Sequence, residues 1–357
     1  MRDMPSHRHR WLSVVGAPAI EALRFRTYAG EEDAPALAEV AQAANAANGD
    51  TEFISAASIA IDMANRTHID PGEDVVLALV GDRLVAWSSI EWSDTSDGER
   101  HYRSFGDVHP DWRRRGIGRA LLERNEARLR ELAVAHEHPG PRMLMTWLND
   151  RDDGGIALVT AHGYRRVRVY HHMVRPDLEA IEVPSMPEGL EIRPLRREQL
   201  HQVWDAMSEA FIDHFGADDT SEAAFRRWSQ DPHLDLDLLI MAFDGDEIAA
   251  GVQGQIDQDE NEAQRYLRGW TDPIFTRRRW RRRGLASALI GRTLLALRER
   301  GMTSAQLGVD SQNANEALGL YRRHGFEVVR SSSEWHKPLV EGADGGGRVG
   351  RAAGSPG

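Results

Sequence analysis

Short apolar runs joined by a glycine occur twice along this chain. The run at 75–80 is followed directly by Gly81-Asp82, and the run at 238–243 is followed after one residue by Gly245-Asp246. A second apolar run comes next in each case. Apolar runs separated by a glycine-containing pair are typical of β-hairpins. The pattern therefore predicts two hairpins, about 164 residues apart.

Two longer stretches have a helical period instead. Apolar residues recur three and four positions apart at 116–132 and 284–300, which predicts amphipathic helices. Each helix precedes another predicted strand, at 143–148 or 304–310. Strands and helices mixed in this way indicate an α/β (α+β) fold.

The chain repeats itself. Four pairs of segments match in the same order, with offsets of 162 to 168 residues: 23–28 with 190–195, 75–87 with 238–251, 108–122 with 276–290, and 161–167 with 323–329. Collinear matches with drifting offsets indicate duplication of one domain-sized module.

We expect five parts in the chain. They are a flexible tail (1–20), a first module (21–178), a linker (179–189), a second module (190–340) and a glycine-rich disordered tail (341–357). No apolar run is long enough to span a membrane, so we expect a cytoplasmic protein with no membrane partner.

The composition excludes several kinds of catalytic site, metal site and partner. The 357 residues include no cysteine, which excludes disulfides, cysteine nucleophiles and thiolate metal sites. The net charge of −12 argues against nucleic acid as a partner. No histidine pair has the spacing of metal ligands, so we expect no metal.

An arginine-rich loop joins a strand to the long helix in each module. The sequences are VHPDWRRRGIG at 108–118 and TRRRWRRRGLA at 276–286. The first turn of a helix has unpaired N–H groups and the positive end of the helix dipole, and small residues let a phosphate approach. Each loop is therefore predicted to bind a diphosphate.

This arrangement resembles motif A of the GCN5-related N-acetyltransferases (GNAT superfamily). In that family, the loop binds the pyrophosphate of acetyl-coenzyme A (acetyl-CoA), and the end of the preceding strand pairs with the pantetheine arm. The resemblance implies a splayed central sheet in each module and assigns acetyl-CoA contacts to two sets of residues. The first set is Asp107, Val108, Arg113, Arg114, Arg115, Gly116, Ile117 and Gly118, and the second is Phe275, Thr276, Arg281, Arg282, Arg283, Gly284, Leu285 and Ala286.

The second module continues with a segment that resembles motif B of the same family, N-x-x-x-A-x-x-L-Y-x-x-x-G-F at 313–326. The resemblance implies that Asn313 contacts the coenzyme and that Tyr321 lies near the thioester sulfur. A phenol with a pKa near 10 is protonated at neutral pH and can donate a proton to the departing thiolate. A packed core aromatic is the alternative interpretation of Tyr321.

The first module departs from motif B. Aligning Gly163 with Gly325 places Val159 opposite Tyr321, and valine cannot donate a proton. We therefore expect the second module to be catalytic and the first to have a degenerate site. The general base is left open among Asp272, Asp310, Glu262 and Glu334, each of which could equally be a solvated surface charge.

The sequence thus predicts an N-acetyltransferase that moves acetyl from acetyl-CoA directly to a primary amine. Its layout resembles that of the tandem, mycothiol synthase-like members of the superfamily, and its partner is expected to be a small-molecule amine. The alternatives are a non-catalytic acetyl-CoA sensor and an interaction protein on degenerate GNAT folds. Either a monomer or a homodimer fits the sequence.

Overall fold

The structure is a computed structural model. It describes residues 9–50, 53–66, 68–95, 98–212, 220–312 and 317–339. The predicted tail at 341–357 lies outside these residues, as does Asn313.

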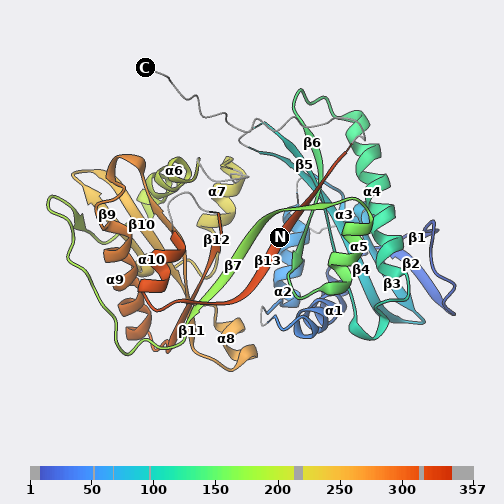
Figure 1. Ribbon diagram of the computed structural model, residues 1–357, viewed down its shortest axis with the longest axis horizontal. Coiled ribbons are helices and arrows are strands. Elements are labelled where there is room, and N and C mark those ends of the chain that lie inside the picture. The colour runs from blue at the N-terminus through green and yellow to red at the C-terminus, as the bar shows by residue number, and fades with distance from the viewer. Residues whose placement is uncertain are drawn as a thin grey trace, which may run out of the picture.

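The described residues form strands and helices in the predicted order (Figure 1). The strands are β1 (Trp11–Leu12), β2 (Leu23–Thr27), β3 (Val75–Val80), β4 (Arg83–Asp94), β5 (Arg100–Val108), β6 (Arg142–Asn149), β7 (Arg165–Arg175), β8 (Glu191–Ile192), β9 (Leu239–Asp244), β10 (Glu247–Gln255), β11 (Arg268–Thr276), β12 (Ser304–Asp310) and β13 (Glu327–Pro338). The helices are α1 (Ala34–Ala47), α2 (Ala56–Asn65), α3 (Pro71–Asp74), α4 (Ile117–Ala135), α5 (Asp153–Ala161), α6 (Leu200–Phe211), α7 (Glu222–Ser229), α8 (Gln258–Gln264), α9 (Leu285–Glu299) and α10 (Ala317–Arg323).

Both predicted hairpins are present, as β3–β4 and β9–β10. The turn glycines Gly81 and Gly245 both have a φ of 60°, a left-handed conformation that glycine adopts without steric cost. The predicted long helices are α4 and α9, which begin at the arginine-rich loops. The mixed α/β fold expected from the pattern is confirmed.

All thirteen strands of the described chain join in one sheet. Its order is β1-β2-β3-β4-β5-β6-β13-β7-β12-β11-β10-β9-β8. Each half contains one parallel pair, β5–β6 or β11–β12, and each pair is short. Pairing ends at Arg103–Met145 in one half and at Trp270–Gln306 in the other, although the strands continue. Each half is therefore splayed, with a wedge-shaped opening after its parallel pair.

The two halves exchange their last strands. β7 belongs to the first half of the sequence but pairs with β12 of the second, and β13 pairs with β6 of the first. β7 and β13 also pair with each other, and they cross between the halves at the centre of Figure 1. This exchange joins the two modules through backbone hydrogen bonds.

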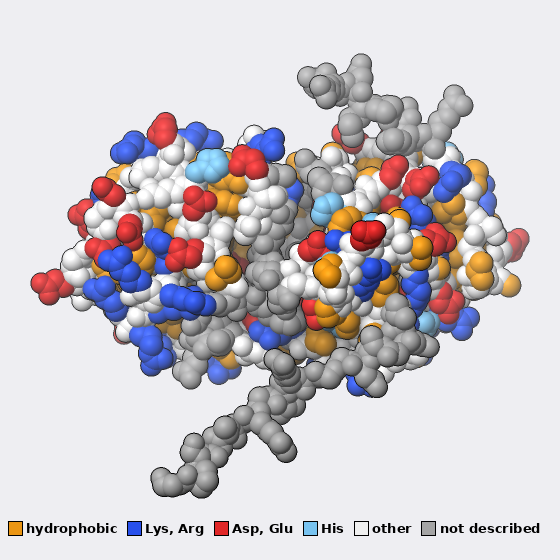
Figure 2. Space-filling view, turned by 90° about the horizontal axis from the view of Figure 1, so that it is seen from above, with side chains coloured by type: hydrophobic (Ala, Val, Ile, Leu, Met, Phe, Trp, Pro, Cys, Tyr) orange, Lys and Arg blue, Asp and Glu red, His pale blue; other side chains and the backbone are white. Residues whose placement is uncertain are grey.

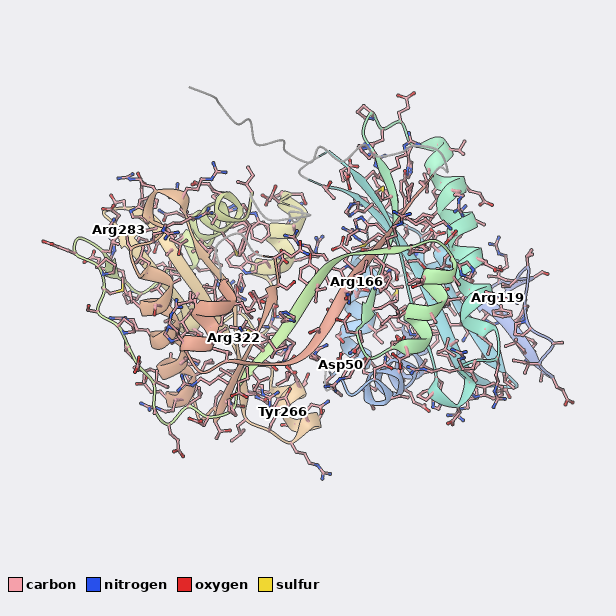
Figure 3. All side chains as sticks on the ribbon, in the orientation of Figure 1. Asp50, Arg119, Arg166, Tyr266, Arg283 and Arg322 are labelled. Atoms are coloured by element: carbon pink, nitrogen blue, oxygen red, sulfur yellow. The ribbon has the colours of Figure 1, made fainter. Side chains whose placement is uncertain are left out.

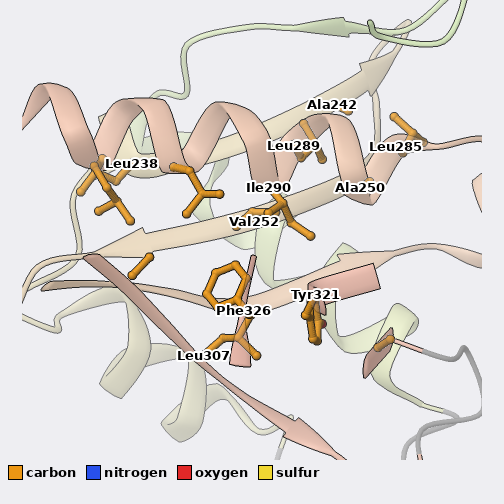
Figure 4. Packing of buried hydrophobic residues seen from close by; sticks show 14 of the residues in the cluster. Leu238, Ala242, Ala250, Val252, Leu285, Leu289, Ile290, Leu307, Tyr321 and Phe326 are labelled. Atoms are coloured by element: carbon orange, nitrogen blue, oxygen red, sulfur yellow. The ribbon is translucent and has the colours of Figure 1, made fainter. Parts of the chain in front are cut away.

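The core of the second half lies between α9 and the sheet. Leu289, Ile290 and Leu294 of α9 are completely buried, and they belong to the same cluster as Phe326 and Tyr321 (Figure 4). The α4 helix covers the first half in the same way through Leu122 and Leu129. Both long helices are therefore fixed by their apolar faces, which sets the position of the loop before each.

The N-terminal segment differs from the expectation of a flexible tail up to residue 20. Trp11 and Leu12 form β1 against β2, and Val14 is buried in a core cluster. Short runs of apolar residues carry too weak a signal to reveal an edge strand before its partner is known.

Among the described residues, no helix is long and apolar enough to cross a membrane. Basic and acidic side chains are interspersed over the face shown in Figure 2. Neither observation identifies a partner.

Candidate functional site

The two arginine-rich loops have the same backbone conformation. Arg113 has φ −63° and ψ 159°, and Arg281 has φ −61° and ψ 157°. The next residues, Arg114 and Arg282, have φ of 61° and 62°. This agreement extends the sequence match at 108–118 and 276–286 to the path of the chain.

A glycine in the left-handed region begins each long helix. Gly116 has a φ of 89° and Gly284 a φ of 86°. Left-handed residues in a tight turn direct nearby N–H groups toward one point, a concavity that binds anions. Because this concavity lies at the start of α4 or α9, the helix dipole also favours a phosphate there.

The arginine three residues before the glycine of each loop is already engaged within the protein. Arg113 donates hydrogen bonds from Nε to the Val108 carbonyl (3.2 Å) and from Nη1 to Asn48 Oδ1 (2.9 Å). Arg281 donates in the same way to the carbonyls of Thr276 (3.0 Å) and Ala210 (3.1 Å). These side chains link the end of the strand to a neighbouring helix through hydrogen bonds. We therefore expect the N–H groups of the loop to bind the anion.

The other predicted loop residues take different positions. Arg114 and Arg282 are exposed, Arg115 stacks on Trp112, and Arg283 donates a hydrogen bond to the Glu188 carbonyl. Ile117 and Leu285 are buried in the core beneath the loops, and Phe275 is buried beneath α6. Their side chains support the loops from below.

A cavity of about 830 Å³ fills the wedge of the first half. Its walls include Val108, Gly116 and Gly118 from the loop side and Val159 from α5. Asp107 also lines it and accepts a hydrogen bond from Trp87 Nε1 at 3.1 Å. Burial raises the pKa of the Asp107 carboxyl to about 7, and the hydrogen bond from Trp87 opposes part of that shift.

The second half brings Tyr321 and Asp272 together. Tyr321 of α10 is 7% exposed, and its ring packs edge-on against Phe326. Burial raises the pKa of its phenol above the ordinary value, and the negative charge of Asp272 adds to that shift. Asp272 Oδ2 reaches across the splay and accepts a weak hydrogen bond from Gly308 N at 3.4 Å. Both groups are therefore at the opening between β11 and β12.

The other predicted base candidates have different surroundings. Asp310 forms an ion pair with Arg168, with Nη2–Oδ2 at 2.6 Å. Glu334 is 3% exposed and accepts hydrogen bonds from His336 and Tyr170. The third candidate, Glu262 on α8, has an exposed side chain.

The sequence did not single out Glu260. This buried carboxylate accepts hydrogen bonds from Tyr266, Trp270 and Gln306. Trp270 and Gln306 form the last pair before the strands separate, so Glu260 closes the base of the wedge. No local sequence pattern identifies Glu260, because its hydrogen-bond donors come together only when β11 and β12 are paired.

One group among the described residues has the makeup of a metal site. Ligand atoms of Glu99, His101 and His336 lie within 4.8 Å of one another. His101 contacts Glu99 at 3.1 Å, and His336 contacts Glu334 at 2.5 Å. Since each histidine has a carboxylate partner, these contacts need no ion to explain them, and the expected lack of a metal stays a prediction.

Comparison with known proteins identifies the class. The model of the Acetyltransferase (GNAT) family matches residues 39–138 and 200–326, which together make up more than half of the chain. The chain belongs to this family.

The similar proteins are acetyltransferases too. The mycothiol acetyltransferase of Geodermatophilus obscurus is 29% identical over 276 residues, 74% of this chain and 82% of that protein. The mycothiol acetyltransferase of Salinispora arenicola is 32% identical over 225 residues, 61% of this chain and 67% of that protein. The chain is accordingly an N-acetyltransferase, and acetyl-CoA is the co-substrate of its family.

Solved structures share the two-module fold. A GCN5-related N-acetyltransferase from Sphaerobacter thermophilus has a TM-score of 0.70 and 24% identity, covering 90% of this chain and 96% of that one. A tandem GNAT protein from the clavulanic acid biosynthesis pathway has a TM-score of 0.61 and 18% identity, covering 89% of this chain and 99% of that one. The expected tandem GNAT architecture is confirmed.

The raised pKa of Asp107 predicts a pH-dependent stability. Between about pH 4 and pH 7 the unfolded chain ionises this carboxyl while the folded protein keeps it protonated. The free energy of unfolding should therefore fall for the wild type, relative to Asp107→Asn, as pH rises through this range. Urea unfolding of both proteins from pH 4.5 to pH 8 measures the difference, and a constant difference would contradict the prediction.

Proposed function

We propose that the second module catalyses direct transfer of acetyl from acetyl-CoA to a primary amine. The observation that carries the proposal is that Asp272 lies at the opening of the wedge, within electrostatic range of the buried Tyr321 phenol. A proton donor and a proton acceptor are both needed there, since the amine loses a proton and the thiolate gains one.

Tyr321 acts as the general acid. The attacking nitrogen forms the C–N bond, the C–S bond breaks, and the phenol donates its proton to the sulfur. Its raised pKa keeps the phenol protonated at neutral pH until charge develops on the sulfur. Ordinary proton transfer of this kind contributes about 10²–10⁴-fold to rate.

Asp272 acts as the general base. It accepts the proton that the amine loses, either before or during attack. Asp310 is held by Arg168 and Glu334 by His336, whereas Asp272 is half-buried at the opening itself. Its negative charge also favours an ammonium form of the acceptor near the site.

The acceptor is a small molecule. The similar mycothiol acetyltransferases act on a small-molecule acceptor according to their names, and the carboxylates Glu260 and Asp272 make the wedge of the second module suitable for a cationic amine. We propose a primary amine of this kind, carried by a polar scaffold.

The first module binds acetyl-CoA without transferring the acetyl group. Its loop has the same conformation as that of the second module, and its 830 Å³ cavity continues from the loop into the wedge. Val159 lines that cavity at the position corresponding to Tyr321, and a valine has no proton to give to a departing thiolate. This division supports a catalytic module joined to a binding module.

Removing the phenol of Tyr321 should strongly slow acetyl transfer. We expect Tyr321→Phe to lower kcat about 10²–10⁴-fold with little change in KM for acetyl-CoA. The matched control is Tyr164→Phe, a change to a buried tyrosine of the first module whose ring contacts Lys337, and it should leave kcat unchanged. Thiol release over a panel of primary amines measures both.

The assignment would be reversed by one pattern of results. Loss of turnover in Gly116→Val, together with a normal kcat in Tyr321→Phe, would place catalysis in the first module.

Asp272→Asn should slow transfer most strongly near neutral pH. The variant should recover part of its kcat as pH rises toward the pKa of the amine, because more acceptor then arrives already deprotonated. The pH profile of kcat, compared with that of Glu262→Gln on the exposed face of α8, tests this. A profile parallel to that of the wild type would exclude Asp272 as the base.

Each loop should bind its own acetyl-CoA. Valine is strongly disfavoured at a positive φ, so Gly116→Val and Gly284→Val should each distort one loop. Calorimetric titration should give two equivalents of acetyl-CoA in the wild type and one in each variant. One equivalent in the wild type that survives Gly116→Val would show that the first module binds none.

A further inference from the structure

The exchanged strands carry equivalent arginines. Arg168 of β7 and Arg330 of β13 are 162 residues apart, the same offset as between the repeats at 161–167 and 323–329. Each arginine therefore occupies the same position in its module. Each also lies on a strand that pairs with the other module.

Arg168 holds the end of the splayed strand β12. Its Nε donates to both carboxylate oxygens of Asp310 at 3.0 Å, and its Nη2 donates to Oδ2 at 2.6 Å. Its Nη1 donates to Gln312 Oε1 at 3.2 Å, and the backbone of Ser311 donates to the Val169 carbonyl at 2.9 Å. The Arg168 and Asp310 side chains are only 17% and 13% exposed, so this is a desolvated, multidentate ion pair.

Arg330 makes a similar but indirect contact in the first module. It forms an ion pair with Asp50, whose side chain is 6% exposed. Asp50 also accepts a hydrogen bond at 3.1 Å from Asn149, the last residue of the splayed strand β6. The backbone of Asp150 donates to the Ser331 carbonyl at 3.0 Å, which matches the Ser311–Val169 bond 162 residues away on β7.

Both contacts act where the wedge is formed. Beyond Trp270–Gln306, β12 has no partner on β11, and β7 pairs with its other edge as far as Asp310–Tyr170. In the first module, β13 pairs with β6 as far as Ser332–Asn149. Each wedge is therefore kept open by a strand of the other module. An arginine of that strand holds the far wall, Arg168 directly through Asp310 and Arg330 through Asp50 and Asn149.

We propose that Arg168 and Arg330 are reciprocal positioning residues. Each is carried by the last strand of one module and holds open the acetyl-CoA wedge of the other, so neither module forms a competent wedge alone. This inference rests on the proposed binding of acetyl-CoA to both modules. Figure 3 shows Arg166 on β7 at the crossing and Asp50 at the seam between the halves.

Calorimetry with acetyl-CoA tests the proposal in two backgrounds. Gly116→Val leaves the second module as the intact site, and Gly284→Val leaves the first. In the Gly116→Val background we expect Arg168→Ala to raise Kd about tenfold, the loss expected when one multidentate ion pair is removed. In the Gly284→Val background, Arg330→Ala should do the same and Arg168→Ala should not.

Two further variants separate positioning from general destabilisation. Arg168→Lys keeps the charge but not the planar fork, so its Kd should lie between those of Arg168→Ala and the parent. Arg166→Ala removes an exposed arginine of the same strand and should leave Kd unchanged. If Arg168→Ala does not fold, Asp310→Asn replaces it with the same expected rise in Kd.

Three outcomes would overturn the proposal. They are an unchanged Kd in Arg168→Ala, an equal loss in both backgrounds, and an absence of acetyl-CoA binding in the wild type. Thiol release tests the catalytic assignment separately. If the wild type binds acetyl-CoA but transfers nothing to any amine, the catalytic assignment fails, and the Kd comparison still decides the role of the arginines.

Discussion

Backbone hydrogen bonding at the two splayed pairs is the constraint on which the rest of the structure depends. A strand needs partners for its N–H and C=O groups, yet a binding wedge requires β6 and β12 to leave β5 and β11. The conflict is resolved because β13 and β7 pair with the other edges of β6 and β12. Since each of these partners comes from the other module, opening the wedges also joins the two halves into one sheet.

Duplication preserved the loops and changed the chemistry beside them. The two loops agree in φ to within a few degrees at Arg114 and Arg282. The residue directly before the loop is Asp107 in the first module, where it lines the cavity. In the second module it is Phe275, which is buried beneath α6. The backbone concavity depends on chain conformation and tolerates such changes, whereas an acid needs one particular side chain. Anion binding is therefore easier to conserve than catalysis after a duplication.

Much of the fold and part of the candidate site could be predicted from the chain. The hairpins at 81–82 and 245–246, the helices α4 and α9 and the two loops all arise from local patterns, and the structure has each of them. The roles of Arg113 and Arg281 could not be predicted, because both guanidinium groups bind carbonyls of helices distant in sequence. Glu260 was missed for the same reason, since its three donors converge only in the folded sheet.

The sequence by itself determined that the chain holds two copies of one module, that each copy has an arginine-rich loop before a long helix, and that Tyr321 of the second copy corresponds to Val159 of the first. These features depend on residues close together in the chain. The tertiary structure alone decided which strand completes which wedge, and which carboxylate lies at the opening of the second wedge. Pairing partners for β7 and β13 are set by hydrogen bonds between segments distant in the chain, which local sequence patterns do not reveal.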